Sequence, residues 1–220
     1  MNGLIFDVDG VLGDSESLSE RASIRVFKES FGVEVRGEDF REFIGTGPHR
    51  YMSGVAEKHG LEIDVDAAIE TRQAFYVELL QGGLDIRFPG THDLIHAARD
   101  SADWQLAIAT SSPRNKAEVT LGAARIELDW FDVLIFGDMV EHKKPNPEIY
   151  LKAMDGLGMA AEDCVIIEDA ITGVQAAKAA GCACLAVTNS FPEEQLSQAD
   201  RIVPTLEGVT LNDLLRLMGK

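Results

Sequence analysis

Short, uninterrupted apolar runs that alternate with helix-like segments constrain the fold of this chain more than any other feature. Such runs are typical of parallel strands that are covered on both faces. They occur at residues 4–6, 105–109, 133–136, 164–167 and 184–187. The intervening patterns, such as residues 147–157 and 170–180, predict helices, and Gly181 stands where a glycine commonly ends one. This alternation predicts an α/β layered domain with a parallel sheet.

One long stretch departs from the alternation, because residues 15–83 contain helical patterns and no convincing strand. Ser17 and Glu20 have the spacing of a capping box, which predicts that a helix opens there. Further helices are predicted at residues 38–44, 49–59 and 66–81. Gly82-Gly83 then predicts a flexible exit. We therefore expect an α/β core, residues 1–15 plus 86–220, with an inserted helical module at residues 16–85.

The chain is strongly acidic. Its 220 residues include 20 Lys+Arg against 37 Asp+Glu, which gives a formal net charge of −17. Nucleic acids and anionic membranes bind to clustered positive charge, so this balance argues against both as partners. An anionic substrate would have to be received by a local metal ion or basic group.

The sequence also predicts the cellular compartment of the protein. No apolar run approaches the length of a transmembrane helix, and the first residues lack the basic flank and long apolar stretch of a signal peptide. Cys164, Cys182 and Cys184 have no disulfide-framework spacing. They are typical of small buried side chains in a reducing compartment. We therefore expect a cytoplasmic protein, and we expect a monomer.

Polar and charged residues follow four of the predicted strands. Because ligands of an open parallel sheet bind beyond the carboxyl ends of its strands, these residues are expected to converge on one edge. They are Asp7 and Asp9 after the first strand, Thr110, Ser111 and Ser112 after the second, Lys144 beyond the third, and Glu168 and Asp169 after the fourth.

The acidic members of this set predict a metal site. Carboxylates that crowd together repel one another unless a cation neutralises them. Hard carboxylate oxygens with few neighbouring histidines favour Mg²⁺, which keeps water ligands and accepts a phosphate oxygen of a substrate. The expected cofactor is therefore Mg²⁺, beside Asp7, Asp9, Glu168 and Asp169.

The same set suits phosphoryl transfer. A phosphoryl group in transfer spreads negative charge over its oxygens, which the Thr110 hydroxyl, the Lys144 ammonium and the metal could stabilise together. Asp7 would attack phosphorus. Asp9 would protonate the leaving oxygen and then deprotonate the water that hydrolyses the aspartyl phosphate.

Each element of the set has an ordinary explanation when it is taken alone. An Asp after a strand is usually a turn residue, and Thr110-Ser111-Ser112 has the composition of a helix N-cap. Glu168-Asp169 alone suits a helix start, and Lys144-Pro145 alone suits an exposed loop. The ordered set favours chemistry, because each element stands at the end of its own strand.

These residues carry a resemblance to the haloacid dehalogenase superfamily that spans almost the whole chain. Asp7-Val8-Asp9-Gly10 begins a segment that resembles its first motif, and Ile108-Ala109-Thr110-Ser111-Ser112 resembles the second. Lys144-Pro145-Asn146-Pro147 resembles the third motif, and Ile167-Glu168-Asp169-Ala170 the fourth. The resemblance implies a Rossmann-like core with a helical cap inserted after the first strand, where the helical module is predicted.

The resemblance also implies roles for the residues. It makes Asp7 the nucleophile and Asp9 the acid/base, and it argues against dehalogenation, because relatives that displace halide lack this second acid and the metal. The implied Mg²⁺ ligands are Asp7, the backbone carbonyl of Asp9, and Asp169, with Glu168 beside the metal. The implied phosphate-binding residues are Thr110, Ser111 and Lys144.

The chain looks closest to the β-phosphoglucomutase-like phosphatases, so we expect a phosphatase of a small phosphorylated metabolite such as a sugar phosphate. In the mutase, basic cap residues hold a second phosphate, and Arg72 falls near such a position. The mutase pattern places a basic residue soon after Gly45, where this chain has Gly47-Pro48 and only then Arg50. We therefore favour hydrolysis and keep a phosphosugar mutase as the alternative. Arg50 and Arg72 remain candidate substrate-binding residues against ordinary surface charge.

Two non-enzymatic alternatives share parts of this pattern. Phospho-accepting receiver domains also bring acids, a hydroxyl and a Lys-Pro to strand ends, but they are shorter and lack a helical insertion. They carry their acidic pair at the first strand, whereas Glu168-Asp169 follows Lys144 here. An idle relative retained as a binding module is the other alternative, and the filled chemical positions argue against it.

Overall fold

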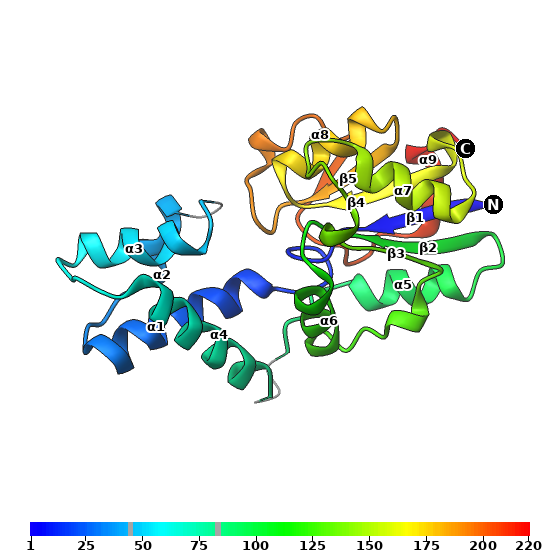
Figure 1. The fold of residues 1–220 in the computed structure, drawn as a ribbon. Helices are drawn as coiled ribbons and strands as arrows, with labels where there is room; N and C mark the ends of the chain where they lie inside the picture. Colours follow the sequence, from blue (N-terminus) through cyan, green and yellow to red (C-terminus); the bar gives the residue numbers. More distant parts are fainter. Residues whose placement is uncertain (44–45, 82–84) are drawn as a thin grey trace. The chain divides into compact units, whose positions relative to one another are not determined.

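The computed structural model describes residues 1–43, 46–81 and 85–220 (Figure 1). Within these ranges the chain forms two compact units, one of Met1–Asp14 with Asp85–Lys220 and one of Ser15–Leu84. The predicted glycine exit at Gly82-Gly83 lies outside the described residues, as does Ile44 at the end of a predicted helix. No helix in the described ranges is long and apolar enough to cross a membrane.

The first unit is built on a parallel sheet, which confirms the α/β prediction. Its strands run in the order β3-β2-β1-β4-β5-β6, and every neighbouring pair is parallel. The strands are β1 (Asn2–Phe6), β2 (Trp104–Ala109), β3 (Val133–Ile135), β4 (Cys164–Glu168), β5 (Ala183–Val187) and β6 (Arg201–Val203). Strand β1 lies between β2 and β4, so later strands are added on one side of β1 up to β3 and on its other side from β4 onward. This reversal marks the position where open α/β sheets bind ligands.

Helices cover both faces of the sheet, with α7 and α8 over one face and α5 over the other (Figure 1). They are α5 (Thr91–Arg99), α6 (Arg114–Ala123), α7 (Glu148–Leu157), α8 (Ile171–Ala179) and α9 (Leu211–Leu217). Side chains of β1 alternate between these layers. Ile5 packs with Tyr150 of α7 in one core cluster, and the ring of Phe6 meets that of Phe131 at 6.2 Å. The apolar run of β1 is therefore buried on both sides, as its composition predicts.

Strand β6 was not predicted from the sequence. Its three residues are Arg201-Ile202-Val203, all of them half-buried, and the strand lies at the edge of the sheet. A three-residue strand that starts with Arg gives no apolar run to detect. The end of α8 was predicted well, since Gly181 adopts a φ of 81° just beyond the helix.

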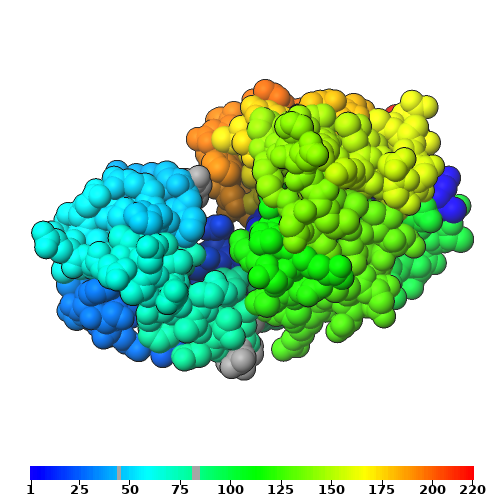
Figure 2. Space-filling view, in the orientation of Figure 1, coloured from blue at the N-terminus to red at the C-terminus, as the bar shows by residue number. Residues whose placement is uncertain are grey.

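The second unit is helical and has its own core. It contains α1 (Ser15–Phe31), α2 (Gly37–Phe40), a 3-10 turn (Arg41–Phe43), α3 (Pro48–Lys58) and α4 (Val65–Gln81). Phe27, Phe40 and Tyr51 pack at its centre, and the rings of Phe40 and Tyr51 stack at 4.8 Å. Arg25 of α1 holds α4 through an ion pair of 2.6 Å with Glu78. In the space-filling view, the surface of this unit carries the blue and cyan colours of the early residues (Figure 2).

Two helix predictions in this unit were wrong in detail. Helix α1 begins at Ser15, so Ser17 and Glu20 lie inside the helix and do not form its capping box. Ser and Asp are equally common at helix starts, and this segment offers several of them, so spacing alone could not choose. The described part of the helix predicted at residues 38–44 forms a single turn of α-helix, Gly37–Phe40, followed by the 3-10 turn. Elements this short cannot be told from a longer helix by periodicity.

Candidate active site

The segment after β1 turns sharply at the carboxyl edge of the sheet. The N–H of Asp7 donates to the carbonyl of Ile167 at 3.1 Å, so Asp7 is still held against β4. The carbonyl of Val8 then accepts from the N–H groups of Leu12 at 2.9 Å and Val11 at 3.2 Å, which closes the turn. Gly10 has a φ of 82°, and a Cβ there would lie 1.8 Å from Asp169 Oδ2. A glycine is therefore required where the turn passes Asp169, the residue that follows β4.

Three carboxylates gather at this edge. Asp7, Glu168 and Asp169 each offer an oxygen within 4.8 Å of the others, and all three are buried. Burial, with a contribution from Glu168, raises the pKa of Asp7 to about 7 against the opposing charge of Lys144. Burial and the neighbouring Glu168 raise the pKa of Asp169 to about 8. A set of hard oxygen donors that resists ionisation in this way is suited to a divalent cation such as Mg²⁺.

Lys144 brings positive charge into the cluster. Its Nζ lies 2.5 Å from Asp7 Oδ1 and 2.7 Å from Glu168 Oε1, and it donates to the carbonyl of Ala109 at 3.2 Å. Burial alone would lower the pKa of Lys144, but the charges of Asp7 and Glu168 raise it above its ordinary value. The ammonium therefore stays protonated beside Asp7, at the ends of β1, β2 and β4.

Glu168 is the charged partner of Lys144. The hydroxyl of Tyr150 donates to Oε1 at 2.5 Å, and the N–H groups of Asp169 and Ala170 donate to Oε2 at 2.9 and 3.1 Å. Although burial acts to raise it, Lys144 and these hydrogen bonds hold the pKa of Glu168 below its ordinary value. Four donors on one carboxylate fix its position and keep it ionised.

The hydroxyl cluster after β2 does not cap α6, so this part of the prediction was wrong. Pro113 occupies the N-cap position and α6 begins at Arg114. The side chain of Thr110 is buried and its Oγ1 accepts from the N–H of Ser112 at 3.1 Å, whereas Ser111 is exposed. The Ser112 hydroxyl donates to Asp9 Oδ2 instead of to the start of α6.

The carboxylate of Asp9 is bound by two residues of the segment that follows β2. Ser112 Oγ donates to Asp9 Oδ2 at 2.5 Å, and Lys116 Nζ lies 3.1 Å from Asp9 Oδ1. The sequence reasoning missed both contacts. Ser112 was in the candidate cluster without this role, and Lys116 follows it at a spacing of one helical turn, a signal that could have pointed to the pair.

Two further residues reach the site from the end of β5. Asn189 Nδ2 donates to the carbonyl of Gly10 at 2.7 Å, and the Ser190 hydroxyl donates to Asp169 Oδ2. They were missed because the strand-end reasoning stopped at the fourth strand. The same reasoning applied to the fifth strand would have found Asn189 and Ser190, because they follow its apolar run and Thr188.

The two arginines predicted as substrate ligands lie in the helical unit. Arg50 pairs with Glu57 at 2.8 Å and lies 5.0 Å from the ring centre of Phe43. Arg72 lies 5.9 Å from the ring centre of Tyr51, and burial lowers the pKa of its guanidinium. These contacts are all made within the helical unit. The substrate-binding role of both arginines stays a prediction.

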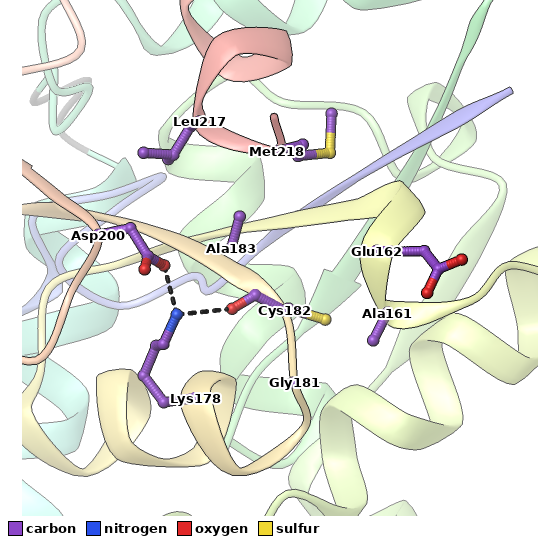
Figure 3. Close-up of a pocket in the computed structure, with 9 residues that line it drawn as sticks. All are labelled: Ala161, Glu162, Lys178, Gly181, Cys182, Ala183, Asp200, Leu217 and Met218. Carbon is purple, nitrogen blue, oxygen red and sulfur yellow. Dashed lines mark hydrogen bonds and ion pairs between the residues drawn. The ribbon is translucent and has the colours of Figure 1, made fainter. Parts of the chain in front are cut away.

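A pocket of about 220 Å³ lies at the opposite edge of the sheet, where β4 and β5 begin (Figure 3). Lys178 and Asp200 line it together with Leu217 and Met218. Lys178 Nζ lies 2.5 Å from Asp200 Oδ2 and also donates to the carbonyl of Cys182 at 3.2 Å (Figure 3). Its charged groups thus hold α8 to β5, and the pocket is separate from the acidic cluster.

Comparison with known families agrees with this geometry. The model of the family described as haloacid dehalogenase-like hydrolase matches residues 4–187, a range that contains all the strand-end residues discussed above except Asn189 and Ser190. The chain belongs to this family. The predicted resemblance is thereby confirmed, and the parallel sheet with β1 at its centre is the hydrolase core of the family.

Individual proteins of known name or structure are also similar to this chain. The hydrolase is 35% identical over 195 residues to a phosphorylated carbohydrates phosphatase of Thermotoga maritima, with 82% of each chain covered. It is 38% identical over 219 residues to the chloroplastic protein SUPPRESSOR OF QUENCHING 1 of Arabidopsis thaliana, a match that covers 98% of this chain and 21% of that protein. Its fold is similar to a crystal structure of CbbY from Rhodobacter sphaeroides in complex with phosphate, with a TM-score of 0.75 and 30% identity over 97% of this chain and 99% of that one.

Proposed function

We propose that this hydrolase is a Mg²⁺-dependent phosphatase that acts on a small phosphorylated metabolite and carries the phosphoryl group on Asp7. The observation that carries the proposal is the position of Asp7. Its carboxylate is paired with a buried lysine at 2.5 Å and lies among acids suited to a divalent cation, at the sheet edge where such folds bind ligands. Positive charge on both sides of a carboxylate lets it approach a phosphate dianion.

The reaction divides into two displacements at phosphorus. In the first, an Asp7 oxygen bonds to phosphorus while the bond to the leaving oxygen breaks, and Asp9 gives that oxygen a proton. In the second, Asp9 takes a proton from water as the water oxygen bonds to phosphorus and the bond to Asp7 breaks. The products are the alcohol and phosphate, and both carboxyl groups return to their starting state.

The remaining residues of the site stabilise charge and position. Lys144 and the hydroxyl of Thr110 face the phosphoryl oxygens in this proposal, and Glu168 holds Lys144 in place. Mg²⁺ would be held by Asp7, Asp169 and the backbone carbonyl of Asp9, where it would neutralise the negative charge of the phosphate. The three clustered acids fit this assignment, since burial and the charge of Glu168 raise the pKa of Asp7 and of Asp169, and a bound cation would favour their ionised forms.

The substrate class is proposed from the relatives. The phosphorylated carbohydrates phosphatase of Thermotoga maritima and the CbbY complex with phosphate favour phosphate esters of small, hydroxyl-rich molecules. We propose that the helical unit selects among them as a cap, with Arg50 and Arg72 as candidate contacts. A phosphosugar mutase remains the alternative, since it would use the same two aspartates.

A phosphate-release screen of metabolite esters with Mg²⁺ tests the proposal. It should include β-glucose 1-phosphate with its bisphosphate activator, because the two functions then give different products. Release of phosphate without isomerisation supports the phosphatase. Formation of glucose 6-phosphate supports the mutase, and turnover that persists in excess chelator would refute the metal role.

A further inference from the structure

The segment that follows β2 contacts both oxygens of the Asp9 carboxylate. Ser112 Oγ donates to Oδ2 at 2.5 Å and Lys116 Nζ lies 3.1 Å from Oδ1. The two residues are one helical turn apart, and Lys116 lies in the first turn of α6. A hydrogen bond to one oxygen and an ion pair to the other fix the plane of a carboxylate more firmly than either contact alone.

The two aspartates that follow β1 therefore have different partners. Asp7, Glu168 and Asp169 form the acidic cluster that the described residues contain, and the Asp9 carboxylate is not part of it. Lys144 pairs with Asp7 and Glu168, whereas Lys116 pairs with Asp9. Asp7 and Asp9 follow the same strand, but a different lysine pairs with each carboxylate.

We propose that Lys116 is a positioning residue that holds the Asp9 carboxyl group on the leaving-group side of the site, away from the metal ligands. The inference rests on the proposed phosphatase function. An acid/base that serves two displacements must stay within reach of the leaving oxygen and then of the attacking water. A protonated carboxyl group can still accept from Lys116 through one oxygen while its O–H points to the leaving oxygen.

The ion pair has little to do with stability. The Lys116 and Asp9 side chains retain 42% and 21% of their exposure, and ion pairs between exposed side chains contribute little to stability. Replacement of Lys116 is therefore expected to leave folding intact. A loss of turnover that depends on the leaving group would therefore come from the position of Asp9.

The experiment compares leaving groups. A nitrophenolate leaves phosphorus with little need of a proton, whereas an alkoxide leaves poorly without one. The kcat/KM of wild type and Lys116→Met is measured with Mg²⁺ for 4-nitrophenyl phosphate, phenyl phosphate and glycerol 2-phosphate. Lys116→Met should lose about 10- to 100-fold for glycerol 2-phosphate and less than about threefold for 4-nitrophenyl phosphate, because general acid catalysis contributes about 10²- to 10⁴-fold. Lys116→Arg should restore most of the loss.

Arg114→Met is the matched control. It removes one positive charge from the same turn of α6, but Arg114 pairs with Glu118 at 2.7 Å instead of Asp9. All three substrates should stay within about threefold of wild type in this control, and all variants should unfold at the wild-type temperature.

The outcomes separate the two proposals. An equal loss for every substrate, or no loss for any, overturns the role of Lys116 while the phosphatase proposal stands. A wild-type protein that hydrolyses none of the three esters with Mg²⁺ overturns the phosphatase proposal, and the role of Lys116 falls with it.

Discussion

At the scale of single residues, the proposed metal site depends on side chains that touch its ligands from outside the motifs. The hydroxyl of Ser190 donates to Asp169, and Asn189 holds the Gly10 carbonyl at 2.7 Å. Such contacts orient a ligand before the metal arrives, and their loss commonly weakens metal binding. The two residues after β5 therefore serve the site although they carry no chemistry of their own.

Replacement of Ser190 tests this support. Ser190→Ala should weaken Mg²⁺ binding by about tenfold, because Asp169 loses the donor that fixes its carboxylate. Isothermal titration calorimetry of Mg²⁺ into the purified protein measures this directly and needs no substrate. The control is Ser197→Ala, at an exposed position, and it should bind Mg²⁺ as wild type does. Equal affinities in both variants would contradict the role of Ser190.

At the scale of elements, the site is assembled where strand ends and helix starts meet, and the tightest junction lies between β4 and α8. Glu168 ends β4, and Gly173 lies in the first turn of α8. A Cβ on Gly173 would lie 1.8 Å from Glu168 Oε1. The helix can approach the carboxylate this closely only because the residue has no side chain.

The junction predicts a contrast between two glycines in helices. Gly173→Ala should lower the free energy of unfolding by about 1–3 kcal/mol, because the added methyl pushes on a buried, fully bonded carboxylate. Gly122→Ala in α6 meets nothing within 4 Å and should raise it by up to about 1 kcal/mol. Urea unfolding measures both changes. A Gly173→Ala protein as stable as wild type would show that the junction can relax.

The same scale shows how far sequence alone could go. The buried strands were predictable because each is an apolar run covered on both faces, and the acids and lysine at their ends followed from the parallel order. The edge strand β6 and the start of α1 were not, since a half-buried three-residue strand and a run of equivalent capping residues leave no unique pattern. The partners of Asp9 were missed for a different reason: Ser112 and Lys116 stand four residues apart, but this spacing does not indicate which acid their side chains contact.

At the scale of the whole molecule, a chain of net charge −17 concentrates buried acids around one buried lysine. An acid whose pKa is raised by folding binds its proton more tightly in the folded state, so stability falls as pH rises between the two pKa values. For Asp7 this interval runs from 3.8 to about 7, and for Asp169 from 3.8 to about 8. Glu168, whose pKa is lowered, adds stability that is lost only below its ordinary 4.5.

The metal-free protein should therefore become less stable as pH rises from about 5 to about 8, by at most about 1.4 kcal/mol per pH unit for each raised acid. Saturating Mg²⁺ should flatten this dependence, because cation binding displaces the protons. Urea unfolding in chelator and in Mg²⁺ at each pH provides the comparison. Stability that rises over this range in chelator would mean that these acids are already ionised in the folded state.

The proposed mechanism depends on Asp7 as the residue that attacks phosphorus. Turnover of 4-nitrophenyl phosphate with Mg²⁺ is the most direct measurement, made on Asp7→Asn beside Asp129→Asn, the same change at an exposed position. Asp7→Asn should lose at least about 1,000-fold in kcat while unfolding cooperatively, because an amide cannot form the phosphorus–oxygen bond. Asp129→Asn should keep wild-type activity. An Asp7→Asn protein that turns over at the wild-type rate would contradict the mechanism proposed for this site.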